Sequence, residues 1–254
     1  MRSLLLVLAL GLALPLPLAT AGAPATAGTP SVDELLRRLD ANMTFDTRSS
    51  KLTMTVTKGG RTKVYTMQSY GRGADDAAME FLSPDRDAGT RMLKKGDELW
   101  MYLPSVEKTQ RISGHMLRQG MMGSDFSYED MLESAALRTL YTSTITGEEV
   151  KDGVACYRLE MIANQPEVSY PKRIMWMDKQ NLVPVHQELY AVSGMMLKEI
   201  VFSNVKTFGD RQFPTKIVAT DKLQTGSSTV VTFDELTFSV KLEEEVFSMR
   251  WLER

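Results

Sequence analysis

The sequence predicts a mainly β fold with a few helices (α+β), in which one large, curved antiparallel sheet is covered by helical segments. Apolar and polar residues alternate with a period of two through most of the chain, and turn-forming residues separate these runs. We count roughly ten or eleven strands, and a sheet of that size must curl, close or be covered. Because only an N-terminal stretch and a central stretch lack this alternation, we expect a half-barrel with a helix and a helical lid over it.

The first residues are typical of a secretory signal peptide. Arg2 supplies a short basic start, residues 4–14 are apolar and uncharged, and small residues suited to cleavage follow. This apolar run is about 11 residues long, whereas a membrane-spanning helix needs roughly 18 or more. No cysteine lies near the cleavage site, so we expect no lipid anchor. We assign residues 1–21 to the signal peptide, 22–30 to a linker and 31–254 to a single soluble, exported domain.

The next predicted element is a helix over residues 32–42. Ser31 can cap it, and Glu34 lies three residues further on, which is the spacing of a capping box. Four apolar residues fall on one stripe of this helix: Val32, Leu35, Leu36 and Leu39.

Alternation of period two begins after this helix. Residues 50–73 predict two strands joined at Gly59-Gly60, a pair that favours a hairpin turn. A strand stopped by Pro84 follows, and then two strands that turn around a Lys-Gly-Asp sequence. Residues 112–143 lose the alternation, after which strands resume with turn signals between neighbours. This order along the chain suggests an antiparallel meander.

The composition gives little support for several functional classes. The formal net charge of −2 provides no argument for nucleic-acid binding. His115 and His186 are the only histidines, and they have no metal-ligand spacing to each other or to the lone Cys156. Phosphate-binding loops and dinucleotide-binding glycine motifs are absent. We therefore expect no metal and no cofactor.

The stretch GSDFSYEDML, residues 123–132, admits two interpretations. Ser127 and Asp130 have the spacing of a capping box, which predicts a short helix from Tyr128 to Leu137. The apolar residues of that helix share one face: Tyr128, Met131, Leu132 and Ala135. Asp125 is not explained by the helix, and we expect it to anchor the stretch to a neighbouring element.

The second interpretation is a hydrolase that uses serine, histidine and acidic residues of the central stretch. A Ser-His-Asp arrangement could be drawn from Ser113, His115 and Asp125, and Ser124 is a further candidate nucleophile. No Gly-x-Ser-x-Gly nucleophile elbow occurs, and proximity in sequence does not support a triad, because triads assemble from distant parts of a fold. The helical interpretation is therefore favoured.

Methionine is abundant, with 17 residues, and several crowd the central stretch beside Gly114, Gly120 and Gly123. Met side chains are flexible and polarizable, so they suit irregular apolar surfaces, although ordinary filling of a core is the alternative. On a stretch punctuated by glycine they favour a movable lid over an apolar cavity.

Four motifs resemble one protein family. The sequence MEFLSPDRDAGTRMLKKGDELWMYLPSVEKTQRIS, residues 79–113, resembles the LolA-like family of periplasmic outer-membrane lipoprotein-sorting proteins. GSDFSYEDML looks like the signature of one branch of that family, and DKQNLVPVHQELY (178–190) and VFSMRWLER (246–254) are similar to the same branch. The resemblance implies an open, incomplete antiparallel β-barrel whose concave face is covered by helices and shelters acyl chains.

The resemblance also implies a function. It implies a non-enzymatic carrier or chaperone in the periplasm, whose partners are lipid or lipoprotein acyl chains, an inner-membrane transporter as donor and an outer-membrane acceptor. A module that senses lipids or lipoproteins and signals to a membrane partner is the alternative, because one fold can serve several functions.

Candidate ligand-binding residues combine the resemblance with the alternation. The candidates on the sheet are Met67, Met79, Phe81, Met92, Trp100, Tyr102 and Trp176. The candidates on the lid are Met116, Leu117, Met121, Met122, Phe126, Met131 and Leu132. Alternation does not reveal which face is concave, so half of the sheet candidates can point outward. The resemblance implies that a strand arginine holds the lid; Arg72 and Arg91 are the candidates, with Asp125 as a further anchor.

Overall fold

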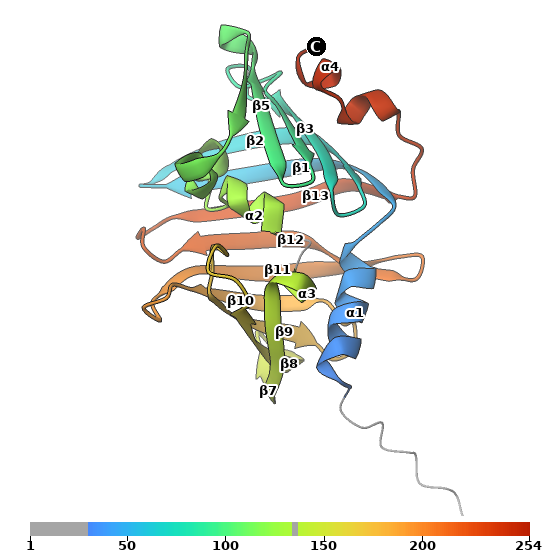
Figure 1. The fold of residues 1–254 in the computed structure, drawn as a ribbon, viewed down its shortest axis with the longest axis vertical. Coiled ribbons are helices and arrows are strands. Elements are labelled where there is room, and N and C mark those ends of the chain that lie inside the picture. Colours follow the sequence, from blue (N-terminus) through green and yellow to red (C-terminus); the bar gives the residue numbers. More distant parts are fainter. Residues whose placement is uncertain (1–29, 134–136) are drawn as a thin grey trace, which may run out of the picture. The chain divides into compact units, whose positions relative to one another are not determined.

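The computed structural model describes residues 30–133 and 137–254, and thirteen strands in this part of the chain form one antiparallel sheet (Figure 1). The predicted signal peptide, residues 1–21, and residues 22–29 of the linker lie outside the described residues. The strands are β1 (Thr47–Lys58), β2 (Arg61–Arg72), β3 (Asp76–Ser83), β4 (Arg91–Lys95), β5 (Glu98–Leu103), β6 (Lys108–Ile112), β7 (Tyr141–Lys151), β8 (Val154–Ala163), β9 (Lys172–Asp178), β10 (Pro184–Tyr190), β11 (Met196–Phe208), β12 (Arg211–Asp221) and β13 (Ser228–Phe238). The α-helices are α1 (Val32–Met43), α2 (Tyr128–Glu133), α3 (Leu137–Leu140) and α4 (Met249–Leu252).

The order of strands in the sheet is β6-β5-β4-β3-β2-β1-β13-β12-β11-β10-β9-β8-β7. Every neighbouring pair except β1 and β13 is also consecutive in the sequence, which confirms the predicted antiparallel meander. The sheet does not close, so β6 and β7 are its two edges. The predicted open sheet with helical elements is therefore confirmed. The sequence analysis did not predict strand β6, because its sequence, KTQRI, is mostly polar and lacks apolar alternation. Its side chains are mostly exposed or half-buried, which is typical of an edge strand.

The predicted N-terminal helix is confirmed as α1. The Ser31 hydroxyl accepts a hydrogen bond from the backbone N–H of Glu34 at 3.2 Å, so the predicted cap is present. Leu35, Leu36 and Leu39 are buried against one end of the sheet. Their partners there include residues of β8 and β9: Leu159, Met161, Met175 and Met177.

The central segment, residues 113–140, connects the two edge strands β6 and β7. It contains two 3-10 turns, Gly114–Arg118 and Met121–Gly123, followed by the short helices α2 and α3. Figure 1 shows α2 lying in front of the sheet near β12 and β13. The predicted helix from Tyr128 starts where expected and is described to Glu133; residues 134–136 lie outside the described residues, and Leu137–Leu140 are again helical.

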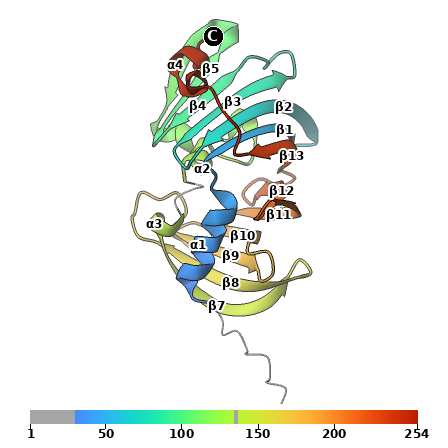
Figure 2. The same ribbon diagram turned by 90° about the vertical axis from the view of Figure 1, so that its right-hand side faces the viewer.

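The C-terminal residues cover the other face of the sheet. A 3-10 turn, Glu244–Phe247, leads into α4; the turn packs against β3 and β4, and α4 packs against β4 (Figure 2). Phe247, Trp251 and Leu252 are buried there together with Ala78 and Leu93. Thus α1 and the central segment cover one face, whereas the end of the chain covers the opposite face of strands β3 to β5.

Candidate functional site

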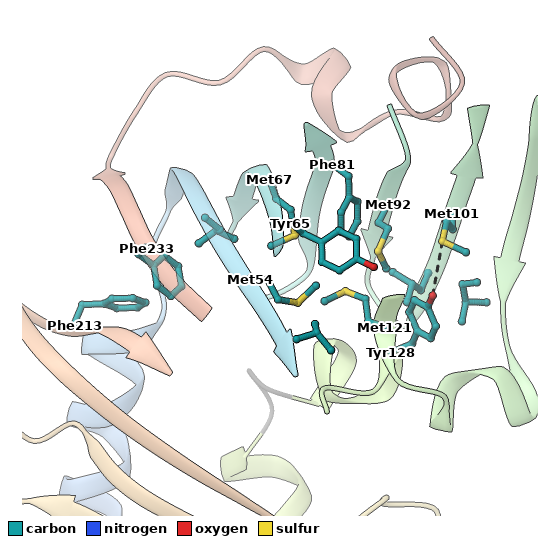
Figure 3. Packing of buried hydrophobic residues seen from close by; sticks show 14 residues of the cluster. Met54, Tyr65, Met67, Phe81, Met92, Met101, Met121, Tyr128, Phe213 and Phe233 are labelled. Atoms are coloured by element: carbon teal, nitrogen blue, oxygen red, sulfur yellow. Dashed lines mark hydrogen bonds between the residues drawn. The ribbon is translucent and has the colours of Figure 1, made fainter. Parts of the chain in front are cut away.

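A methionine-rich core lies where the central segment meets strands β1 to β6 (Figure 3). Met121 and Tyr128 of the central segment are buried in it, and the Tyr128 hydroxyl lies 3.8 Å from the sulfur of Met101. Four candidate residues are fully part of this core: Met67, Phe81, Met92 and Met121. Six more pack against it while partly buried: Met79, Met116, Leu117, Met122, Met131 and Leu132. The structure therefore brings most of the candidate residues together.

Three sheet candidates do not join this core. Trp100 and Tyr102 pack with Leu93 and the C-terminal residues on the opposite face of the sheet. Trp176 belongs to a separate cluster that includes Cys156, and its ring makes an edge-to-face contact with the ring of His186. The reason is the period of two: on β5 the buried core residues are Leu99 and Met101, so the residues that alternate with them must face the other way. The expectation that these three aromatic residues lie with the other candidates on the inner face is therefore corrected.

An apolar cavity of about 340 Å³ lies next to the methionine-rich core. It is partly open, and it is lined by α1, the central segment and the inner face of the sheet. Phe126 and Met131 are the two candidate residues that line it. The other apolar lining residues were missed, and they include Leu189, Ile200, Phe213, Ile217 and Phe233. A pocket of about 300–1,000 Å³ with apolar walls is typical of sites for small ligands.

Asp125 holds the central segment to β13. Its side chain is buried, and its two carboxylate oxygens accept hydrogen bonds from the hydroxyls of Ser227 and Thr229, the latter at 2.6 Å. Its backbone N–H donates to Thr229 Oγ1 at 2.8 Å. A carboxylate that accepts two hydroxyl hydrogen bonds is well compensated for its burial. The structure thus gives Asp125 the kind of partners that the sequence led us to expect.

Asp130 makes a second and more extensive connection. Together with Ser127 it forms the predicted capping box: Ser127 N–H donates to the Asp130 carboxylate at 2.7 Å, and Asp130 N–H donates to Ser127 Oγ at 3.1 Å. The same carboxylate forms an ion pair with Lys198 of β11 and accepts a hydrogen bond from the Tyr170 hydroxyl at 2.9 Å. Burial and this carboxylate raise the pKa of Tyr170 well above its usual value. The cap was predictable from sequence, whereas the ion pair was not.

Among the described residues, no hydrogen bond or ion pair joins Arg72 or Arg91 to the central segment. Arg72 pairs with Asp76 at 2.6 Å and with Glu244 at 2.6 Å. Arg91 pairs with Glu80 at 2.9 Å and donates to the backbone carbonyl of Trp251 at 3.3 Å. Both arginines lie on the face that the C-terminal residues cover, so they hold the end of the chain. The proposal that they anchor the lid is therefore corrected.

Arg48 is the functional candidate that the sequence analysis missed. Its guanidinium lines the cavity, with its central carbon 4.5 Å from the centre of the Phe45 ring and 5.7 Å from that of Phe233. A signal was available, because Arg48 is in phase with the buried face of β1. The residues that follow it at intervals of two are Ser50, Leu52, Met54 and Val56, all buried. A charge in phase with a buried face marks a position with a special environment.

The residues of the hydrolase interpretation do not form a catalytic arrangement in the described part of the chain. Ser124 Oγ lies 3.2 Å from the backbone oxygen of Phe126 and accepts from its N–H at 3.3 Å, so the hydroxyl closes a local turn. No hydrogen bond joins Ser124 to His115. Among residues 30–133 and 137–254, no three His, Cys, Asp or Glu side chains come together as metal ligands. No helix in these same ranges has the length and apolar character needed to cross a bilayer.

Comparisons with known proteins place the chain in a family. No curated protein sequence matches it. A DUF1329 family protein from Desulfovibrio piger is 26% identical, covering 86% of this chain and 96% of its own, with a TM-score of 0.79. A putative outer membrane lipoprotein-sorting protein domain from Vibrio parahaemolyticus is 25% identical, covering 87% of this chain and 97% of its own, with a TM-score of 0.76.

A LolA superfamily protein from Nitrosomonas europaea is 23% identical, covering 88% of this chain and 100% of its own, with a TM-score of 0.73. The fold that the resemblance implied is therefore confirmed. The model of a family of uncharacterized proteins matches residues 73–254, which is most of the chain. The chain belongs to this family of uncharacterized proteins and has the open-sheet fold of the LolA superfamily.

Proposed function

We propose that this protein is a non-enzymatic periplasmic carrier or chaperone that shelters the acyl chains of lipids or lipoproteins for sorting to the outer membrane. The observation that carries the proposal is the apolar cavity of about 340 Å³ that α1, the central segment and the sheet line. The structural similarity to a putative outer membrane lipoprotein-sorting domain also supports the proposed carrier function. A cleaved signal peptide over residues 1–21 would export the chain, and an inner-membrane transporter and an outer-membrane acceptor would be its donor and recipient.

Binding in such a cavity requires only that the acyl chain is buried, without any chemical reaction. Each acyl CH₂ group removed from water contributes about 0.8 kcal/mol, so a chain of several groups is held without any covalent step. Release requires the cavity to open. The central segment is suited to opening because its described residues form short turns and helices, and polar contacts such as those of Asp125 and Asp130 fasten it to the sheet.

The proposal is tested by native mass spectrometry of the protein purified from its own periplasm and by uptake of a fluorescent fatty acid. We expect co-purified lipid or acylated protein, and saturable uptake after delipidation. A protein that is empty and also takes up no fatty acid would overturn the proposal. Movement of bound cargo to acceptor vesicles or an acceptor protein supports a carrier, whereas bound cargo that never transfers favours the sensing alternative.

A matched pair of variants locates the binding site. Ala77 lines the cavity from β3, so Ala77→Phe should fill it and reduce uptake of the fatty acid. Ala155 is an exposed residue of β8, so Ala155→Phe adds the same side chain outside the cavity and should leave uptake unchanged. Equal uptake by both variants would show that cargo binds elsewhere.

A further inference from the structure

The cavity contains a cation, Arg48, that no described residue neutralises. The guanidinium of Arg48 forms no hydrogen bond and no ion pair with any residue in the described part of the chain, and its Nε is buried without a partner. Its contacts are with the faces of two aromatic rings, Phe45 and Phe233. A buried polar group without a partner is uncommon and needs an explanation.

The other charges of the cavity do not compensate Arg48. Three carboxylates line the cavity, and each already has a cation: Asp40 pairs with Arg138 at 3.4 Å, Asp76 with Arg72 at 2.6 Å, and Asp130 with Lys198. Of the lining cations, Arg173 donates to the Tyr141 hydroxyl at 2.7 Å. Lys94 donates to the backbone carbonyl of Ala74 at 2.6 Å and forms no ion pair with a described residue. Each lining carboxylate thus has a cation, whereas Arg48 and Lys94 form no ion pair with a described residue.

Arg48 and Lys94 belong to one row across the sheet. Arg48 of β1 is opposite Gly71 of β2, Gly71 is opposite Ala77 of β3, and Ala77 is opposite Lys94 of β4. All four residues line the cavity. Adjacent strands are about 4.8 Å apart, so the two cationic residues start roughly 14 Å from each other and reach over the two small residues between them. The row thus forms a recess with a cation at each end.

The absence of a side chain at Gly71 leaves room for this arrangement. A Cβ at that position would lie 2.9 Å from Cε2 of Phe45 and 3.7 Å from Nη2 of Arg48. Gly71 therefore allows the ring of Phe45 to lie beside the guanidinium. The glycine leaves open space beside the unpaired guanidinium, whereas a larger apolar residue would have filled that space.

Arg48 keeps its charge under ordinary conditions. Burial lowers the pKa of its guanidinium to about 10, which is still far above neutral pH. Burial also lowers the pKa of Lys94, while Asp75, Asp97 and Asp76 oppose that change. A charge kept in an apolar site without a counter-charge destabilises the empty protein. An anion bound beside it would remove that penalty.

We propose that the cavity takes an amphiphile with an anionic headgroup, a carboxylate or a phosphate attached to an acyl chain, and that Arg48 binds the headgroup with Lys94 at the other end of the recess. This inference rests on the proposed function, because it names the class of lipid that the same cavity accepts. The planar guanidinium suits both oxyanions, since it can donate two parallel hydrogen bonds to either. The apolar lining residues Leu189, Ile200 and Phe213 contact the chain.

The test compares an acid with its neutral ester. Binding of cis-parinaric acid and of methyl cis-parinarate, two fluorescent probes with the same chain, is measured on the full protein after delipidation. The variants are Arg48→Met, Arg48→Lys and, as a control, Arg111→Met, whose arginine is exposed and pairs with Glu98. We expect the acid to bind more tightly than the ester. Arg48→Met should weaken the acid about 10- to 100-fold, the usual effect of losing a charged hydrogen bond, and the ester by less than about threefold.

The source of the headgroup is distinguished by competition. Oleate and lysophosphatidylglycerol should displace the acid probe from the wild-type protein, whereas millimolar inorganic phosphate should not, because it has no chain to bury. Displacement by inorganic phosphate alone would contradict an amphiphile. If only one of the two lipids competes, the headgroup is assigned to that one.

A purely structural role of Arg48 predicts a different outcome. In that case Arg48→Met would lower the thermal midpoint of unfolding and weaken both probes equally, which would overturn the inference. We expect instead an equal or higher midpoint, because an uncompensated charge is removed. If Arg48→Met does not fold, Lys94→Met tests the other end of the recess with the same probes. Equal binding of acid and ester to every variant refutes the inference and leaves the carrier function standing, whereas binding of neither probe to the wild-type protein refutes the carrier function itself.

Discussion

The ion pair between Asp130 and Lys198 should control how readily the central segment leaves the sheet. The Lys198 and Asp130 side chains are 8% and 14% exposed, and Tyr170 adds a hydrogen bond to the carboxylate and an aromatic face 5.4 Å from the ammonium. Removing one member of a buried pair costs about 3–5 kcal/mol, because the other charge remains without a partner. Asp130→Leu also removes the capping box, which is worth about 1 kcal/mol more.

The two single variants and the double variant form a cycle with a clear expectation. Asp130→Leu and Lys198→Met should each weaken the attachment of the central segment by about 3 kcal/mol or more. The double variant replaces the pair with apolar side chains and should recover most of that loss, apart from the cap. Asp33→Leu is the control, because its ion pair with Arg138 is 76% exposed on the Asp33 side and should contribute almost nothing.

Amide hydrogen exchange resolved by peptide is the suitable assay. A loss of about 3 kcal/mol corresponds to exchange roughly 150-fold faster in residues 113–133, provided that these residues exchange by local opening. Amides of β1 and β2 should change little, since those strands lie in the middle of the sheet. If β1 and β2 lose as much protection as the central segment, the pair stabilises the whole sheet and the reasoning fails. If the double variant is as unstable as the sum of the single variants, the attraction between the charges is not the cause.

Three further predictions follow from local geometry. Burial raises the pKa of the Cys156 thiol to about 11, so Ellman's reagent at pH 8 should modify it only after the protein is unfolded in urea. Lys222 donates to Glu199 at 2.7 Å and holds the pKa of Glu199 below its usual value. Glu199→Gln should therefore be less stable than the wild type above the ordinary glutamate pKa of about 4.3, and the difference in urea unfolding should vanish as pH falls below the folded-state pKa. A Cβ on Gly120 would lie 2.1 Å from the backbone oxygen of Ser124, so Gly120→Ala should loosen the central segment and lower the thermal midpoint, whereas Gly147→Ala, with no atom within 4 Å, should not.

Local patterns in the sequence predicted the features that depend on local physics. The Ser31 cap of α1, the hairpin at Gly59-Gly60 and the reciprocal cap between Ser127 and Asp130 all formed as expected. In each case the interacting groups are three or four residues apart or are joined by a tight turn. No information about the rest of the fold is required for these contacts.

The features that were missed depend on contacts between distant residues. Pairing of β1 with β13 sets the order of the sheet, yet these strands are separated by most of the chain. Alternation assigned Trp100 and Met101 to opposite faces but did not identify the inner one. Arg72 pairs with Glu244, 172 positions away, so its role at the C-terminal end was not visible in its neighbours. Lys198 was missed for the same reason.

The topology itself explains why the central segment covers the cavity. Since β1 pairs with β13 in the middle of the sheet, the two edge strands, β6 and β7, are neighbours in sequence. The segment between them must run from one edge of the open sheet to the other, and its buried residues Met121 and Tyr128 pack against the inner face. Its attachment can then depend on a few contacts, such as those of Asp125 and Asp130, that break without disturbing the hydrogen bonds between strands. If those hydrogen bonds persist when the segment opens, opening costs only the local contacts, and this is the energetic arrangement that the proposed loading and release of an acyl chain would require.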